Sequence, residues 1–234
     1  MMSEPSISAQ SLVRYIGARL PSERKSILRR QKDELAKKTV VPFYQQAVKG
    51  IRDHHRDTPE TLDEMLQRLT RSLDEAQREL ERAPEQDRNK IRNRITRLTN
   101  NIRVCADYKE HFGGRVLKYK LRRCSGLVIA GVRVSGEFTL AGELADRGRT
   151  GPCAIVVDTH ADVPAADDVK NQLELAYALA GGERGEIPLR GFQVWHASSG
   201  RIWRMRQHSA SRWKILRNWC AYIAARWEQR GEGS

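Results

Sequence analysis

The sequence predicts an α+β fold, in which an N-terminal helical region with an antiparallel helical hairpin precedes an α/β domain with a small mixed sheet. Three observations predict it. Apolar residues recur at helical spacing through residues 8–112. Two runs rich in β-branched and apolar residues, 127–140 and 153–157, have the composition of strands. A helical pattern then resumes near Ala165, so strands and helices alternate in the second half.

Short amphipathic segments precede the hairpin. We expect helices over residues 11–20 and 22–38, broken at Pro21, because proline is poorly tolerated inside a helix. Residues 40–42 interrupt the pattern, and apolar residues at helical spacing resume it over 43–51.

Two long helices joined by a short turn are expected over residues 59–112. Thr58 followed by Pro59 is a strong helix start signal. Residues 83–86 end the first helix, and Asp87 is a plausible cap for the second. In both helices the apolar residues alternate in steps of four and three, which is typical of packed helix pairs. Acidic and basic residues are equally numerous here, so we expect ordinary ion pairs on the polar faces.

The pattern changes at Gly113-Gly114, and we place the domain boundary there. Residues 1–113 form the expected helical domain and residues 114–234 the expected α/β domain.

Further elements follow the two strand runs. The helix that begins near Ala165 should reach Leu179 and stop at the glycines that follow. Residues 192–197 and 201–205, joined by Ser-Ser-Gly, form a candidate β-hairpin. A last helix is expected over residues 211–229.

The net charge is the strongest compositional signal. The chain carries 42 Lys and Arg against 29 Asp and Glu, a formal charge of +13, and the basic excess flanks an acidic segment within 151–190. This favours nucleic acid as a partner. Subunits of larger assemblies are also often basic, so a protein partner or a homo-oligomer stays open. The expected nucleic-acid-binding residues are Arg115, Lys118, Lys120, Arg122 and Arg123, together with Arg201, Arg204 and Arg206.

Several classes are disfavoured. No apolar run approaches ~20 residues, so no membrane span is expected. The first residues do not resemble a secretory signal. The four cysteines lack C-x-x-C spacing, which argues against a zinc site and for reduced thiols in a cytoplasmic setting.

Acidic residues stand where their burial would be costly. Asp158 closes the second apolar run, where a carboxylate needs a metal, a cation or water. A companion acid is either Glu137, which follows Val-Ser-Gly, or Asp146. Carboxylates that hold Mg²⁺ would bridge the protein to a phosphate. For Asp167 and Asp168 a simpler explanation is the favourable dipole at a helix N-terminus.

This order of elements and acids resembles the PD-(D/E)XK nuclease superfamily, over about residues 120–205. In that superfamily an acid on one strand and acid-x-Lys on the next hold Mg²⁺. The lysine helps to position the attacking water, and RecB-type members add a glutamine, often with a tyrosine, on the next helix. The resemblance implies a restriction-endonuclease-like fold for the α/β domain. It also implies that Glu137 or Asp146 holds Mg²⁺ with Asp158, and that Gln172 orients the site.

One difference from the superfamily concerns the lysine. Asp158-Thr159-His160 occupies the place of acid-x-Lys, and Tyr177 lies one residue beyond the usual place of the tyrosine. Histidine is largely neutral at pH 7 unless nearby carboxylates, here Asp158 and Asp162, raise its pKa. A neutral His160 could instead ligate a metal or act as a base.

The layout also resembles a group of uncharacterised bacterial proteins. These carry an N-terminal Ser-Ala-x-x-Leu, here Ser8–Leu12, and a C-terminal Ala-Ala-Arg-Trp, here Ala224–Trp227. A lysine is typical of their Ala-Ile-x strand, where this chain has Val156. Two hypotheses follow. One is a Mg²⁺-dependent nuclease that binds DNA or RNA. The other is a non-catalytic binding or assembly subunit, with a defence role implied by the superfamily alone.

Overall fold

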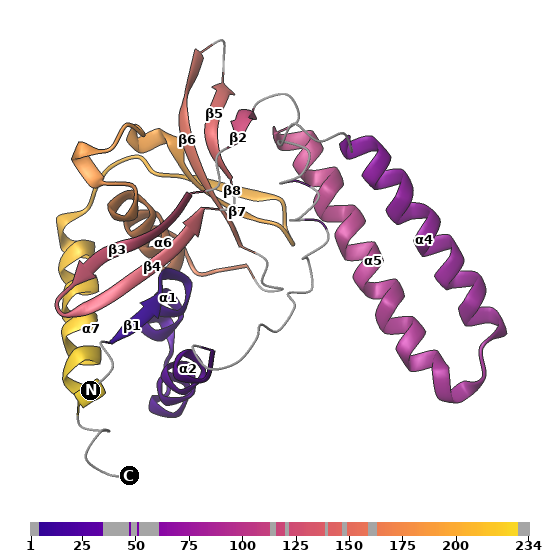
Figure 1. The fold of residues 1–234 in the computed structure, drawn as a ribbon, viewed down its shortest axis with the longest axis horizontal. Coiled ribbons are helices and arrows are strands. Elements are labelled where there is room, and N and C mark those ends of the chain that lie inside the picture. Colours follow the sequence, from indigo (N-terminus) through magenta and orange to yellow (C-terminus); the bar gives the residue numbers. More distant parts are fainter. Residues whose placement is uncertain are drawn as a thin grey trace.

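The computed structural model confirms the α+β class (Figure 1). Its described residues are 5–34, 47, 51, 61–112, 116–119, 122–138, 140–146, 149–158 and 163–228. They include six α-helices and eight strands, with two short 3-10 helices, Gly182–Arg184 and Leu189–Gly191. None of the helices in these ranges is long and apolar enough to cross a membrane.

The larger sheet has five strands in the order β2-β5-β6-β7-β8. They are β2 Val116–Tyr119, β5 Leu140–Asp146, β6 Arg149–Asp158, β7 Phe192–His196 and β8 Arg201–Arg204. β6 and β7 are parallel, whereas the other pairs are antiparallel. Parallel neighbours need a crossover connection, and α6 (Ala166–Leu179) supplies it. The helix and the β7–β8 hairpin that the sequence predicts here are confirmed.

The smaller sheet has the order β1-β4-β3, with β1 Ser6–Ser8, β3 Arg122–Ile129 and β4 Val132–Phe138. β1 is parallel to β4, and β3 and β4 are antiparallel. The run 127–140 is therefore not one strand, because it turns back at Ala130-Gly131. Both turn residues have positive φ, 46° and 80°, as two-residue hairpin turns of type I′ require.

The large sheet is covered on both faces. On one face α6 packs through Leu173 and Ala176 against Phe192 and Val194 of β7. On the other face Trp195 lies against Tyr108 and Phe112, with ring centroids 5.6 and 5.7 Å away. The alternation of side chains along β7 thus assigns each face its own core.

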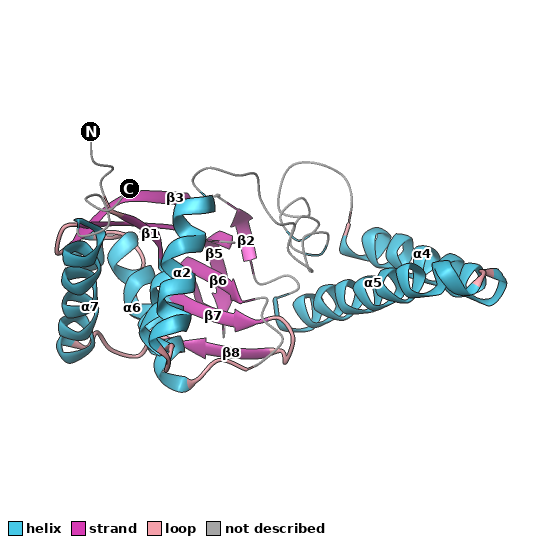
Figure 2. Ribbon diagram, turned by 90° about the horizontal axis from the view of Figure 1, so that it is seen from below, coloured by secondary structure: helices cyan, strands magenta, loops and turns pink. Residues whose placement is uncertain are grey.

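The predicted helical hairpin is confirmed as α4 (Leu62–Arg82) and α5 (Glu85–Phe112), and it projects from the rest of the molecule (Figure 2). The structure places the N-cap of α4 at Thr61, whose side chain accepts a hydrogen bond from the Glu64 backbone N–H while Glu64 caps Thr61 in return. The predicted cap Thr58 lies outside the described residues. Arg94 pairs with Glu79 of the other helix at 2.9 Å, as expected for these polar faces.

The N-terminal elements differ from the predicted domain division. α1 (Ala9–Gly17) and α2 (Pro21–Glu34) do not pack with the hairpin. They share a core with the small sheet and with α7 (Ala210–Glu228), the predicted last helix. Pro21 does not break a helix but starts one, a position where its missing N–H costs nothing. The predicted features over residues 35–46 lie outside the described residues.

The four cysteines are free thiols. Cys105, Cys153 and Cys220 are buried, and burial raises the pKa of Cys153 to about 11 and that of Cys220 to about 12. Both thiols are therefore protonated at neutral pH and poorly reactive.

We predict that Trp195→Ala lowers the free energy of unfolding by about 3–5 kcal/mol, because the fully buried ring leaves a cavity between the sheet and α5. Chemical denaturation monitored by circular dichroism measures it. As a control, Leu20→Ala should change stability by less than about 0.5 kcal/mol, since Leu20 is 57% exposed. Equal losses in the two variants would contradict the docking of α5 through Trp195.

Candidate functional site

Asp158 ends β6 and is 2% exposed. Its parallel partner on β7 is His196, which is fully buried, and the Ala197 backbone N–H donates to the Asp158 carbonyl oxygen at 2.8 Å. Along β6, Ala154 and Val156 contact the core that α6 covers, and strand alternation places Asp158 on the same face. The carboxyl ends of two parallel strands therefore bring an acid and a histidine together, at the edge where α/β sheets commonly bind ligands.

A second carboxylate approaches from α6. Asp168 lies in the first turn of that helix. Its pKa is raised, first by burial and then by the negative charges of Asp167 and Asp158. Gly17, the last residue of α1, leaves room for it, because a Cβ there would lie only 2.8 Å from Asp168 Oδ1. The negative charge of Asp158 thus acts on Asp168, which lies beside the end of α1.

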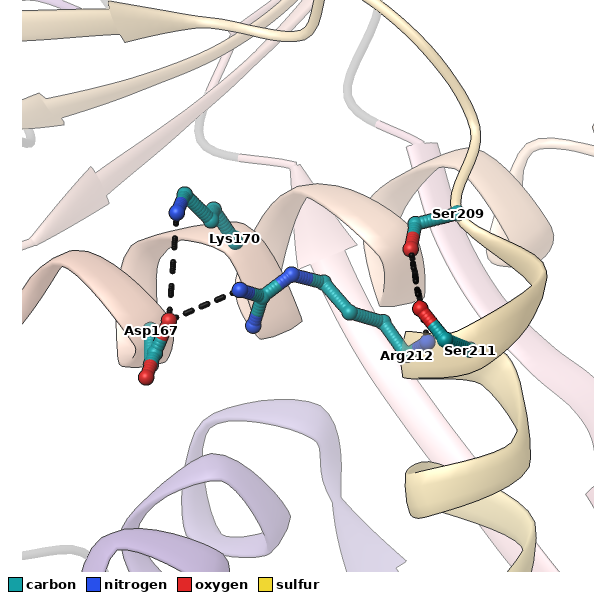
Figure 3. Close-up of polar contacts among 5 residues, drawn as sticks. All are labelled: Asp167, Lys170, Ser209, Ser211 and Arg212. Carbon is teal, nitrogen blue, oxygen red and sulfur yellow. Dashed lines mark hydrogen bonds and ion pairs between the residues drawn. The ribbon is translucent and has the colours of Figure 1, made fainter.

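Asp167, the neighbouring acid, is fully engaged elsewhere (Figure 3). It accepts a hydrogen bond of 2.7 Å from Arg212 of α7, and Lys170 Nζ is 3.8 Å away. The Arg212 hydrogen bond and charge lower the pKa of Asp167. This agrees with the interpretation of Asp167 as an exposed helix N-terminal acid, whereas Asp168 turns inward.

Glu174 is also structural. This residue is 3% exposed and accepts hydrogen bonds from His208 Nδ1 at 2.6 Å and from the Ser209 backbone N–H at 2.7 Å. It joins the middle of α6 to the segment that leads into α7.

Gln172 lines a cavity of about 260 Å³ between α1, β4, β6 and α6. Its Oε1 is buried and accepts no hydrogen bond. Gly136 and Phe138, which flank Glu137 on β4, line the same cavity, as do Val156 and Val157 of β6. The structure therefore brings the backbone around Glu137, the end of β6 and the side chain of Gln172 to one place.

Asp146 is elsewhere. It pairs with Arg149 at the first residue of β6, whereas Asp158 is the last. At about 3.3 Å per residue the two acids are separated by roughly 30 Å along the strand. Glu137, the other alternative for the first acid, lies on β4 of the smaller sheet, where its neighbours Gly136 and Phe138 line the cavity together with Val156 and Val157 of β6.

Other predicted residues are placed as follows. His160 and Asp162 lie outside the described residues, and so do Arg115 and Lys120. Tyr177 is 9% exposed and packs edge-on against Phe192 at 5.6 Å, within the core rather than beside Asp158. The other predicted nucleic-acid-binding residues are on strands or just beyond one: Lys118 on β2, Arg122 and Arg123 on β3, the exposed Arg201 and Arg204 on β8, and the exposed Arg206 after it.

Sequence reasoning missed His196 and the inward turn of Asp168. The His196 ring contacts Ser199 Oγ at 2.7 Å through Nδ1 and Ser198 Oγ at 2.9 Å through Nε2. The only signal for it is its position near the end of a predicted strand, which gains meaning once β7 is known to run parallel to β6. In the described part of the chain, no group of three or more His, Cys, Asp and Glu could hold a metal ion.

We predict that Asp168→Asn stabilises the protein at pH 7 without divalent cations. A raised pKa means that folding is favoured below the ordinary value of 3.8 and that this stability is lost as pH rises through the folded-state pKa. Removing the charge should restore up to about 1 kcal/mol, because water screens the partly buried group. Urea unfolding at pH 3 to 8 measures it.

The matched control lies one residue away. Asp167→Asn should weaken the fold slightly at pH 7, because the pKa of Asp167 is lowered by Arg212 and its charge is favourable in the folded state. If Asp168→Asn were the less stable of the two at pH 7, the repulsion between Asp168 and Asp158 would not be what the geometry indicates.

Comparison of the chain with protein-family models and with curated proteins found no match.

Proposed function

We propose that this protein binds nucleic acid, and that the carboxyl edge of β6 and β7 is a nuclease-like site in which Asp158 is the central carboxylate. The observation that carries the proposal is the buried Asp158 at the carboxyl edge of β6, next to His196 of β7 and on the sheet face that α6 covers, with Asp168 in the first turn of that helix. Two carboxylates held together in a partly buried place are stabilised by a cation. In a chain of charge +13, that edge would attract a cation while the rest of the surface attracts phosphates.

The donor set suits Mg²⁺, which prefers carboxylate oxygens and retains several waters. When bound, Mg²⁺ would polarise a phosphoryl oxygen and favour attack by water. Asp158 would be the ligand that β6 fixes, with Glu137 as its partner from β4. Gln172, with its free Oε1 in the adjacent cavity, would orient a donor group of the substrate or a water.

A second candidate is a non-catalytic nucleic-acid-binding or assembly subunit. Two observations favour it. His160 stands in the place of the lysine that the superfamily uses, and Val156 stands where the similar bacterial proteins have a lysine. Among the described side chains, moreover, no group of three or more His, Cys, Asp and Glu could hold a metal ion. Such a protein would keep the charged surface and the fold and would lack the chemistry.

The decisive variant is Asp158→Asn, which keeps the shape of the buried side chain and removes its charge. We predict loss of Mg²⁺- or Mn²⁺-dependent cleavage of single- and double-stranded DNA and RNA by at least about 100-fold, the range seen when a charge-stabilising group is removed. Binding measured with Ca²⁺ in place of Mg²⁺ should change little. The control is Asp74→Asn, which removes an exposed acid from α4.

The outcomes separate the candidates. Cleavage that survives Asp158→Asn would remove this site from consideration. Absence of cleavage by the wild type, together with salt-sensitive binding, would favour the non-catalytic candidate. Absence of both would overturn the whole proposal.

The affinity for nucleic acid should reside mainly in residues 115–123, whose five cations have no acid among them. We predict that the triple variant Lys118→Glu, Arg122→Glu, Arg123→Glu binds more weakly. Its slope of log affinity against log salt should fall by about 0.7–0.9 for each phosphate group that the variant no longer neutralises. Fluorescence anisotropy titrations at salt concentrations of roughly 50 to 300 mM measure this slope.

The control pair is Arg92→Glu and Arg94→Glu on the hairpin, where acids and bases are balanced and Arg94 already pairs with Glu79. These changes should leave the slope nearly unaltered. A larger loss in the hairpin variant would move the binding surface to α5.

A further inference from the structure

A second cavity lies between the N-terminal half of α2 and the C-terminal end of α7. Its volume is about 440 Å³, within the range of small-ligand pockets. Three aromatic residues and three cations line it: Tyr15, Tyr222, Trp227, Arg24, Lys25 and Arg226. The remaining lining residues are Pro21, Ser22 and Leu28, so no acid is among them.

The cations are not neutralised locally. No described acid forms an ion pair with Arg24, Lys25 or Arg226. The nearest acid in sequence, Glu23, uses its carboxylate to accept the backbone N–H groups of Arg19 and Leu20 before α2. Among the described residues, the positive charge around this concave surface therefore has no acidic partner, and an anion would supply one.

The aromatic rings are arranged in a row. Tyr15 packs edge-on against Trp219 at 5.8 Å, and Trp219 packs edge-on against Tyr222 at 5.7 Å. Two of these rings carry a guanidinium. Arg24 lies over the Trp219 ring at 4.4 Å, and Arg226 lies over the Tyr222 ring at 4.3 Å. The Tyr15 carbonyl accepts a hydrogen bond from Arg24 Nε, which holds that guanidinium in place.

This arrangement leaves the binding groups usable. A guanidinium that lies over a ring engages it with its face, so its N–H donors point outward in the plane of the group, where a phosphate binds. Tyr222 is 38% exposed, unusual for a large aromatic side chain, and offers ring surface to a ligand. Planar bases stack on tyrosine rings and on guanidinium planes alike.

We propose that this cavity binds an unpaired nucleotide of a single-stranded nucleic acid, with the base stacked on the Tyr222–Arg226 pair and the phosphate held by Arg24 and Lys25. The inference rests on the proposed function, since it names a second contact for the same class of ligand. It also specifies the form of the ligand, because a base in a duplex does not present its face for stacking.

The position of the cavity relative to the carboxylates fits one strand reaching both. Tyr15, in the last turn of α1, lines the cavity, and Gly17, two residues later, lies against Asp168. The end of α1 therefore separates a basic, aromatic site from an acidic one. A strand anchored at the cavity would pass the end of α1 toward Asp158.

The test uses the full chain and about 15-nucleotide fluorescein-labelled single strands of DNA and RNA, with a duplex of the same length, in anisotropy titrations. Tyr222→Ala should weaken single-strand binding by about 5- to 100-fold, the worth of one stacked base, and should leave duplex binding nearly unchanged. Tyr222→Phe keeps the ring and should bind like the wild type. Arg226→Ala should weaken single-strand binding as well.

Arg217→Ala is the matched control, because it removes one exposed cation from the same helix outside the cavity. Circular dichroism verifies that each variant is folded. If Tyr222→Ala bound single strands as well as Arg217→Ala does, or if Tyr222→Phe lost as much as Tyr222→Ala, the inference would be overturned while the proposed function stood. A wild type that binds no nucleic acid would overturn both.

Discussion

The parallel pairing of β6 with β7 is the constraint on which the rest of the structure depends. It requires a crossover, and α6 provides one that covers one face of the sheet. It places Asp158 and His196 side by side at the carboxyl edge. It also fixes which residues of β7 meet α6 and which meet α5, so the sheet holds the helical hairpin on the face opposite the candidate site.

Charge is segregated over short distances in this molecule. Asp158 and Asp168 approach each other at the sheet edge, where burial and mutual repulsion raise the pKa of Asp168. On the other side of the α1 terminus, Arg24, Lys25 and Arg226 surround a cavity with no acid in its lining. A ligand of opposite sign would reduce the electrostatic repulsion within each cluster, a cation in the first and an anion in the second.

The sequence predicts most of the elements that depend on local periodicity. The hairpin, α6, the β7–β8 pair and α7 follow from apolar spacing and turn residues. The turn at Ala130-Gly131 could not be predicted, because alanine rarely adopts positive φ. For the candidate site, the sequence names Asp158, Gln172 and, as one of two alternatives, Glu137, and their roles stay predictions. Strand register places Asp146 at the opposite end of β6 from Asp158 and places His196 next to Asp158, and register depends on contacts between residues far apart in sequence.

The projecting hairpin has a mechanical consequence. α5 has 28 residues, about 42 Å at 1.5 Å per residue, yet it meets the sheet through Tyr108 and Phe112 near its C-terminal end. The remainder is paired with α4 and extends away from the sheet, so the hairpin is anchored to β7 around Trp195 (Figure 2). Since Trp195 and His196 are adjacent on β7 and face opposite sides, a torque applied at the hairpin tip acts on the strand that carries His196 and pairs with Asp158.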